Sequence, residues 1–280
     1  MVRRSVMFSP GDRPELMRKA PGTGADTVVF DLEDAVAPGR KAEAREHVRE
    51  LLTDAEFDPD CEVCVRVNPP ASGMADDVEA LAGDLRLDAL MLPKVAGAAD
   101  VDQLDEAFPG ETPPVLALVE SAAGVLAAGD IGSADATDAL VFGAEDLSAD
   151  IGATRTDEGT EVLYAREKVV VAAAAHGLDA IDTVYTDFSD SEGLADETDF
   201  AIQLGYDGKM AIHPSQVPVI NDAFTPAADR IEWAQAVLDA RDEADAEGRG
   251  VFQVDGEMID APLIAQAERV LARARAAGRI

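Results

Sequence analysis

The chain has 280 residues, of which 47% are apolar and only 5% aromatic, so Ala, Val and Leu must build a core large enough for one large domain. Its 56 acidic side chains against 23 basic ones give a net charge of −33, and the absence of a basic cluster excludes an ordinary nucleic-acid-binding surface. No apolar run is long enough for a membrane span or a signal peptide, which predicts a soluble, cytoplasmic protein.

The acidic residues are spread along the whole chain and include 34 Asp, whereas the chain has only 5 Lys. This distribution does not predict an acidic tail. Dispersed, Asp-rich acidity with few Lys is typical of proteins from a salt-loaded cytoplasm, where screening suppresses repulsion between surface carboxylates. The composition therefore predicts a halophilic protein whose carboxylates are mostly solvated surface groups.

Short apolar segments alternate with longer, Ala-rich helical segments along the chain. Several of the apolar segments are almost continuous runs, the pattern of strands that are buried on both faces of a parallel sheet. The predicted strands are 5–9, 27–32, 63–68, 89–93, 115–119, 139–142, 180–184 and 209–212. The predicted helices between them include 42–52, 75–81, 124–128 and 164–176. Eight such units in about 220 residues predict a closed (β/α)8 TIM barrel rather than an open, doubly wound sheet.

Two cysteines, Cys61 and Cys64, form a C-x-x-C pattern. A redox pair of this kind normally opens a helix, where the helix N-terminus lowers the thiol pKa. Here the pair lies at a β-branched run, in which residues three apart point to opposite faces. Neither a redox role nor a metal role is therefore expected.

The last part of the chain follows a different pattern. Its predicted elements are a polar helix, a short hairpin and a final helix, at 231–247, 251–259 and 262–277. Residues 248–250 are predicted to break the first helix, and Asp255-Gly256 is predicted to form the hairpin turn. We interpret residues 1–223 as the catalytic barrel. Residues 224–280 are then an appendage that caps a barrel mouth, and the long charged helix favours the mouth of an adjacent subunit.

Polar residues follow most of the predicted strands. In a (β/α)8 barrel the reactive groups lie at the C-terminal ends of the strands. The residues at or near those ends are Ser9, Asp12, Arg13, Asp31, Glu33, Asp34, Arg66, Asn68, Lys94, Glu120, Ser121, Glu145, Asp146, Asp187 and His213. A purely structural barrel would not be expected to carry so many polar strand ends.

Glu120 and Asp146 are the candidate metal ligands, because they follow neighbouring strands and their carboxylates can converge on one ion. Two carboxylates leave most positions of an octahedral Mg²⁺ to water and substrate oxygens. The alternative is that each carboxylate only caps the helix that follows it. Asp31, Glu33 and Asp34 could hold metal-bound waters, although Asp34 could equally be a helix cap.

Arg66 is the candidate electrophilic group. It closes a predicted strand, so its guanidinium is expected in the barrel mouth, where it can pair with a carboxylate or with a developing enolate oxygen. A buried ion pair with Asp31 or Glu33 is the competing interpretation. His213 follows the last strand in a His-Pro pair, and we interpret it as an orienting or packing residue.

Seven segments together resemble one known family in their order and spacing. They are RSVMFSPGDRP (4–14), FDLEDAV (30–36), VRVN (65–68), LPK (92–94), LVES (118–121), FGAEDL (142–147) and GKMAIHP (208–214). The pattern resembles the citrate lyase β-subunit/malyl-CoA lyase family over nearly the whole chain. Each segment alone is a modest signal, but seven in order are a strong one.

The resemblance implies a Mg²⁺-dependent retro-Claisen enzyme that acts on a CoA thioester and a small 2-oxo acid. It implies that Glu120 and Asp146 hold the metal and that Arg66 stabilises the thioester enolate. The implied CoA-binding residues are Ser9, Arg13, Arg18 and Lys19. The segment GEMIDAP (256–262) resembles the family's C-terminal segment, so that Asp260 would be the acid/base in the active site of an adjacent subunit. A homo-oligomer, a trimer or hexamer, would follow.

The reaction implied is cleavage or formation of a 3-hydroxyacyl-CoA such as (3S)-malyl-CoA, with acetyl-CoA and glyoxylate on the other side. Two alternatives stay open. The same site could hydrolyse the thioester to malate and CoA, or the chain could be the β subunit of a multi-subunit citrate lyase. A C-terminal segment that enters the active site of an adjacent, identical subunit favours a stand-alone enzyme over the β subunit of a complex.

Overall fold

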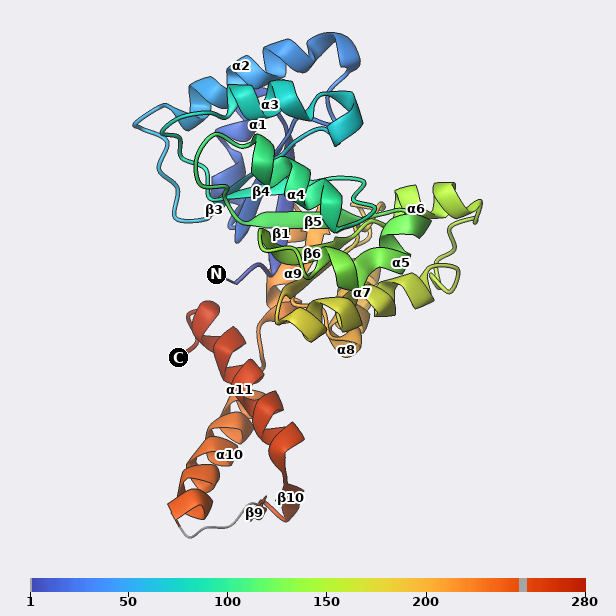
Figure 1. Ribbon diagram of the computed structural model, residues 1–280. Helices are drawn as coiled ribbons and strands as arrows, with labels where there is room; N and C mark the ends of the chain where they lie inside the picture. Colours follow the sequence, from blue (N-terminus) through green and yellow to red (C-terminus); the bar gives the residue numbers. More distant parts are fainter. Residues whose placement is uncertain (1, 247–250) are drawn as a thin grey trace. The chain divides into compact units, whose positions relative to one another are not determined.

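A closed barrel of eight parallel strands, in the order of the chain, forms the core of the computed structural model, which describes residues 2–246 and 251–280 (Figure 1). The strands are β1 (Ser5–Pro10), β2 (Thr27–Asp31), β3 (Glu62–Arg66), β4 (Ala89–Leu92), β5 (Val115–Val119), β6 (Thr137–Phe142), β7 (Asp179–Asp182) and β8 (Gly208–Ala211). The predicted (β/α)8 barrel is confirmed, and no strand end differs from its predicted position by more than two residues.

Alternate residues of the strands fill the barrel interior, because successive side chains of a strand point to opposite faces. The interior cluster consists of Val6, Val29, Cys64, Ala89, Met91, Leu116, Leu118, Ala139, Val141, Ile181 and Met210. The barrel is closed by β1, which pairs with β2 on one side and with β8 on the other. Cys64 lies in this interior, and complete burial raises the pKa of its thiol well above the ordinary value.

Helices surround the barrel and cover the outer faces of the strands (Figure 1). They are α1 (Pro14–Met17), α2 (Lys41–Leu52), α3 (Met74–Ala80), α4 (Ala98–Ala107), α5 (Ala122–Ile131), α6 (Ala144–Ile151), α7 (Leu163–His176), α8 (Ser191–Leu204) and α9 (Gln216–Phe224). Two helices, α6 and α7, lie between β6 and β7. Asp187, expected where the seventh strand ends, lies in the loop after β7 instead, where its carboxylate accepts hydrogen bonds from Ser189. None of the helices among the described residues is long and apolar enough to cross a membrane.

A buried ion-pair cluster closes the amino-terminal end of the barrel. Arg3, which is 4% exposed, precedes β1 and pairs with Glu62 of β3 at 2.7 Å. It also contacts Asp138 of β6 at 2.6 Å and Asp179 of β7 at 3.3 Å. One guanidinium thus joins four strand starts, at the end of the barrel where charged groups stabilise the fold rather than react.

The described residues of Asp222–Ile280 form a second compact unit, separate from Arg3–Asn221, and the boundary falls inside α9. Helices α10 (Ala228–Ala246) and α11 (Ala261–Ala276) pack against a hairpin of β9 (Phe252–Val254) and β10 (Glu257–Ile259). The predicted hairpin is confirmed, since Asp255 and Gly256 have φ of 50° and 87°, as a two-residue turn of this kind requires. The predicted helix break at 248–250 lies outside the described residues.

Candidate active site

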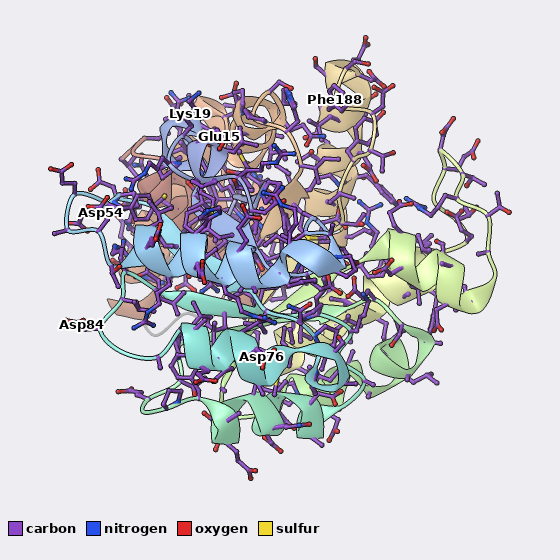
Figure 2. The ribbon with its side chains drawn as sticks, turned by 90° about the horizontal axis from the view of Figure 1, so that it is seen from above. Glu15, Lys19, Asp54, Asp76, Asp84 and Phe188 are labelled. Atoms are coloured by element: carbon purple, nitrogen blue, oxygen red, sulfur yellow. The ribbon has the colours of Figure 1, made fainter. Side chains whose placement is uncertain are left out.

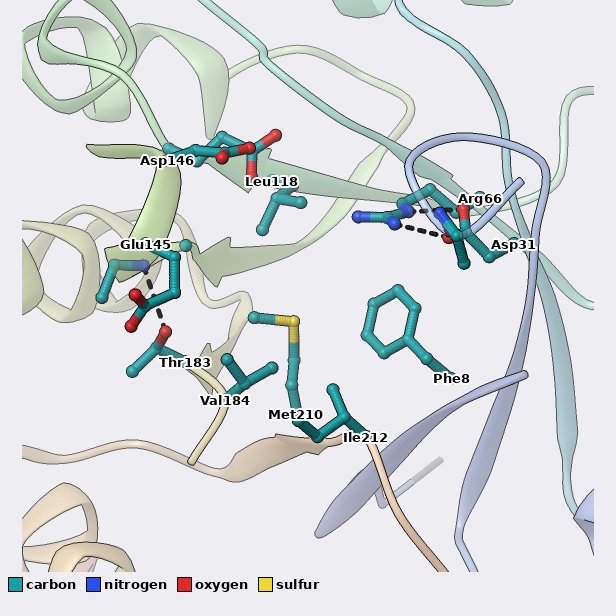
Figure 3. Close-up of a pocket in the computed structure, with 14 residues that line it drawn as sticks. Phe8, Asp31, Arg66, Leu118, Glu145, Asp146, Thr183, Val184, Met210 and Ile212 are labelled. Atoms are coloured by element: carbon teal, nitrogen blue, oxygen red, sulfur yellow. Dashed lines mark hydrogen bonds and ion pairs between the residues drawn. The ribbon is translucent and has the colours of Figure 1, made fainter. Parts of the chain in front are cut away.

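A cavity of ≈ 220 Å³ lies at the C-terminal ends of the barrel strands (Figure 3). Its polar lining comes from Asp31, Arg66, Glu120, Glu145, Asp146 and Thr183. Its apolar lining includes Phe8, Leu118, Val184, Met210 and Ile212. The structure therefore brings four of the predicted site residues, Asp31, Arg66, Glu120 and Asp146, to one cavity.

Neither candidate metal ligand caps a helix, so that alternative interpretation is wrong. Ser121 caps α5, since its Oγ accepts a hydrogen bond from Gly124 N at 3.1 Å. Glu120 is 5% exposed, and its Oε1 accepts a hydrogen bond from Lys94 N at 2.9 Å. Asp146 lies exposed in the first turn of α6, a helix without a side-chain cap.

The charge balance at these two carboxylates fits a bound cation. Burial raises the pKa of Glu120 to about 8, and repulsion from Asp146 and Glu33 adds to the rise. A divalent ion between the two carboxylates would offset this cost. Within 2–246 and 251–280, no group of three or more His, Cys, Asp or Glu is arranged to hold a metal. Two carboxylates at one cavity are a set of oxygen ligands that would suit Mg²⁺, because this ion takes its other ligands from water and substrate.

Arg66 is held by Asp31, as the competing interpretation of this arginine proposed. Its Nε and Nη2 donate to the two oxygens of Asp31 at 2.7 and 2.6 Å, and Asp31 is fully buried. The guanidinium still lines the cavity, with its Cζ 4.9 Å from the centre of the Phe8 ring (Figure 3). Burial alone would lower the pKa of Arg66, but Asp31 and Glu33 raise it above the ordinary value. The result is a permanent cation with a fixed orientation.

Glu33 lies between two cations. Its Oε1 accepts from Lys94 Nζ, and its Oε2 lies 3.3 Å from Arg66 Nη1. The pKa of this carboxyl group is nevertheless raised, because the effect of burial is larger than the opposing effects of Arg66 and Lys94. The exposed Asp34 lies 3.3 Å from Lys94 Nζ, and the alternative that it caps a helix is wrong, since α2 starts only after Arg40.

Lys94 and Thr183 were not predicted as site residues. Lys94 was named only as a strand end, and nothing in the sequence indicates that its backbone has a φ of 57°. Thr183 is 1% exposed, and its Oγ1 accepts from Ala144 N at 3.1 Å, which fixes the start of the helix that carries Asp146. Thr183 lies inside the predicted strand 180–184, and nothing in the sequence indicates a role for it in the site.

The remaining predicted site residues do not line this cavity. Ser9 is 3% exposed, and its Oγ has no hydrogen-bond partner. Arg13 and Arg18 are more than half exposed, Arg18 pairs with Asp54 at 2.8 Å, and Lys19 is exposed on the same connection (Figure 2). His213 is exposed and its ring stacks on Phe188, with 4.9 Å between the ring centres.

Asp260 belongs to the second unit, where it is the N-cap of α11. Its Oδ1 accepts a hydrogen bond from Leu263 N at 3.4 Å, and Pro262 lies in the first turn. This is the cap that a helix-start position predicts. The interactions that Asp260 makes within its own unit are therefore those of a structural residue.

The closed barrel, the two carboxylates and the fixed arginine at one mouth define a (β/α)8-barrel enzyme. Residues 4–214 match the family described as HpcH/HpaI aldolase/citrate lyase. The chain belongs to this family, and the predicted resemblance to citrate lyase β subunits is confirmed.

Three relatives illustrate the range of the family. The mitochondrial citramalyl-CoA lyase of Mus musculus is 37% identical, with 96% of this chain and 85% of the relative covered. A (3S)-malyl-CoA thioesterase of Cereibacter sphaeroides is 35% identical, covering 98% of this chain and 95% of the relative. The crystal structure of CitE from Mycobacterium tuberculosis in complex with magnesium, acetoacetate and coenzyme A matches with a TM-score of 0.81, 38% identity and 98% coverage of both chains. The magnesium in that complex agrees with the predicted Mg²⁺.

Proposed function

We propose that the protein is a Mg²⁺-dependent CoA-ester lyase that cleaves or forms a 3-hydroxyacyl-CoA such as (3S)-malyl-CoA, with acetyl-CoA and glyoxylate as the other pair. The observation that carries this proposal is the distribution of charge in one cavity. Arg66 lies on one side of it and Asp146 on another, with the apolar side chain of Leu118 between them (Figure 3). Glu120 also lines the cavity. Retro-Claisen cleavage requires a cation for the enolate and a separate site for the 2-oxo acid.

Mg²⁺ held by Glu120 and Asp146 would supply Lewis-acid binding for the carboxylate and keto oxygens of the 2-oxo acid. The hydroxyl proton of the substrate goes to a base, for which we propose Asp260 of an adjacent subunit. The O–H electrons form the new carbonyl while the carbon–carbon bond breaks. Arg66 then stabilises the thioester enolate through charge-assisted hydrogen bonds, and the enolate takes up a proton on carbon to give acetyl-CoA. Ser9, Arg13, Arg18 and Lys19 remain the proposed CoA-binding residues.

Thioester hydrolysis at the same site is the second candidate. It is favoured by the Cereibacter relative, a (3S)-malyl-CoA thioesterase that covers nearly the whole chain. Hydrolysis needs a water at the thioester carbonyl and a base beside it, whereas cleavage needs neither water nor a leaving thiol. The two reactions therefore differ in their products. A role as a β subunit within a larger citrate lyase is a further candidate, on acyl groups carried by a second protein.

The deciding experiment incubates the purified protein with malyl-CoA and Mg²⁺ in molar KCl and follows glyoxylate and free thiol separately. Lysis releases glyoxylate without thiol, and hydrolysis releases thiol without glyoxylate. Citramalyl-CoA, the substrate in the name of the mouse relative, is the second substrate to assay. We expect glyoxylate from malyl-CoA. Lysis of citramalyl-CoA releases pyruvate in place of glyoxylate, so pyruvate is followed in that assay. Release of neither a 2-oxo acid nor free thiol from either CoA ester would contradict both activities.

The metal requirement is tested with the same assay. Changing Glu120 or Asp146 to Ala removes one of the two oxygen ligands, so we expect activity to be lost in each variant while the thermal melt stays close to that of the wild type. EDTA should have the same effect on the wild-type protein, and added Mg²⁺ should reverse it. Full activity in the chelator would exclude the metal from the mechanism.

A further inference from the structure

Lys94 has an unusual backbone conformation at the mouth of the barrel. It lies two residues after β4, and its φ of 57° is in the left-handed region. Among the described residues only one other non-glycine, Asp255 in the hairpin turn, has a positive φ. Lysine adopts this region at a cost in conformational energy, and Asn and Gly adopt it far more readily. Such strain persists where the surrounding contacts require it, and it is concentrated at functional sites.

The left-handed conformation lets one residue hold two carboxylates from two strand ends. The main-chain N–H of Lys94 donates to Oε1 of Glu120 at 2.9 Å, and its Nζ pairs with Oε1 of Glu33. Because φ is the rotation about N–Cα, it sets the direction of the side chain relative to the N–H. An ordinary helical φ would turn the side chain by about 120° while the N–H stayed on Glu120. The side chain could then no longer extend in its present direction toward Glu33.

Each of these contacts leaves a neighbouring group available for substrate or metal. The N–H occupies one oxygen of Glu120, so Oε2 remains to bind a cation. The ammonium offsets the charge of Glu33, which is 2% exposed and lies 3.3 Å from Arg66. Without Lys94, Arg66 would be the one cation of the described residues that pairs with the carboxylates of Asp31 and Glu33. The guanidinium would then be drawn more strongly to Glu33 and away from an enolate oxygen.

We propose that Lys94 is a positioning residue with two separable roles, one for its main chain and one for its side chain. The main-chain N–H orients Glu120 for the metal. The ammonium holds Glu33 so that Arg66 remains available to the substrate. Only the side-chain role rests on the proposed lyase function. The main-chain role does not, because binding of a cation by Glu120 needs no substrate. An ordinary surface ion pair, the alternative suggested by the 42% exposure of the lysine side chain, would contribute little and would explain neither the strained φ nor the buried partner.

Three substitutions separate the two roles. Lys94→Gly keeps the N–H and adopts a positive φ freely, but removes the ammonium. Lys94→Val removes the ammonium and also disfavours the left-handed backbone, because Val is β-branched. Lys94→Arg keeps a cation of similar reach. Lys94→Asn, which tolerates the left-handed region, replaces Lys94→Gly if the glycine variant unfolds. Lys168→Ala on α7 is the control for the loss of a lysine that neither lines the cavity nor contacts Glu33 or Glu120.

Cation binding is measured without substrate, with Mn²⁺ as a spectroscopic probe for the Mg²⁺ site. We expect Lys94→Gly to bind Mn²⁺ within about threefold of wild type and Lys94→Val to bind it at least tenfold more weakly, a factor that corresponds to about 1.4 kcal/mol. Thermal melts verify that each variant is folded. Equal Mn²⁺ affinity in folded wild-type, Gly and Val proteins would overturn the main-chain role. Mn²⁺ binding that Glu120→Ala does not weaken would overturn it as well.

The side-chain role is read from steady-state kinetics. We expect kcat of Lys94→Gly to fall at least tenfold with KM for the CoA ester changed little, and Lys94→Arg to restore most of the lost kcat. If Lys94 had only a structural role, its substitution would change the thermal melt. It would not lower kcat selectively, and Lys94→Arg would not restore kcat. Unchanged kcat in the Gly variant would overturn the side-chain role. A wild-type protein inactive on CoA esters would refute the proposed function, and the side-chain role with it, while the Mn²⁺ titrations would still decide the main-chain role.

Discussion

Gly143 and Glu120 approach so closely that a Cβ on Gly143 would lie 2.6 Å from Cβ of Glu120 and 2.8 Å from its Oε2. Side chains do not tolerate such distances, so the position accepts only glycine while Glu120 keeps its present place. Gly143 is also the residue before α6, whose first turn carries Asp146. The spacing between the two carboxylates is thus set by a residue that has no side chain.

Gly143→Ala is expected to displace Glu120 and weaken the metal site. We expect Mg²⁺-dependent activity to fall at least about tenfold, the effect of losing roughly 1.4 kcal/mol of binding. Gly129→Ala is the matched control, since a Cβ there meets no atom within 4 Å. Gly129 lies in the last turn of α5, where that change should stabilise the fold by at most about 0.5–1 kcal/mol and leave activity intact. A Mg²⁺ titration of activity compares the two variants, and an unchanged titration for Gly143→Ala would refute the prediction.

The fold and part of the site could be predicted because both follow from local patterns. Each strand is an apolar run of its own; Glu120 directly follows one such run, and Asp146 lies in the first turn of the helix after the next. The pairing of Arg66 with Asp31 could be given only as an alternative, since it depends on the neighbouring strand. The φ of Lys94 left no trace in the sequence, because contacts with Glu120 and Glu33 impose it.

For Ser9, the alternation of side chains along its strand indicates the face on which it lies. Val6 and Phe8 pack in the barrel interior, so alternation turns Ser9 toward the opposite face of β1. The structure agrees, since Ser9 is buried but does not line the cavity. Proximity to a strand end was therefore a weaker guide than the side of the strand on which a residue lies.

The stability of the metal-free protein should fall as the pH rises toward 8. Burial and the nearby carboxylates raise the pKa of Glu120 to about 8, whereas an unfolded Glu titrates near about 4.3. A folded pKa above the unfolded one means that the folded state holds the proton more tightly. The stability that Glu120 contributes is therefore fully present below the unfolded pKa and is lost as the pH rises through about 8.

Thermal melts of metal-free protein between pH 6 and pH 9 measure this loss. The control is Glu120→Gln, which has no proton to lose, so its melting temperature should decline less over the same interval. Mg²⁺ should remove most of the difference in the wild type, because the ion stabilises the ionised carboxylate. Parallel pH profiles for wild type and Glu120→Gln would show that Glu120 does not titrate in this interval.

Lowering the ionic strength should destabilise the fold. Acidic side chains outnumber basic ones 56 to 23, and at low salt the repulsion between them is no longer screened. We expect the melting temperature to rise from low to molar KCl, and activity to rise with it. A melting temperature that is unchanged, or higher at low salt, would exclude the halophilic interpretation of the composition.

Asp260 has a structural and a proposed catalytic role, and Asp260→Asn separates them. As the N-cap of α11 it accepts from Leu263 N, and Asn caps a helix nearly as well as Asp. If capping is its only role, both the melting temperature and turnover should survive the change. If it is the acid/base, stability should survive while turnover falls by roughly 10²–10⁴-fold, the usual effect of losing a general base. We expect the second outcome.

A shared active site makes a further prediction, that two inactive variants restore each other. In an oligomer where Asp260 of one subunit completes the site of the next, mixing Asp260→Asn with Arg66→Ala produces some interfaces that carry both wild-type residues. Partial activity should then return once subunits have exchanged, which a mass-tagged variant can verify. Neither variant should regain activity alone under the same treatment. Proven exchange without any recovery would mean that each site is built within a single chain.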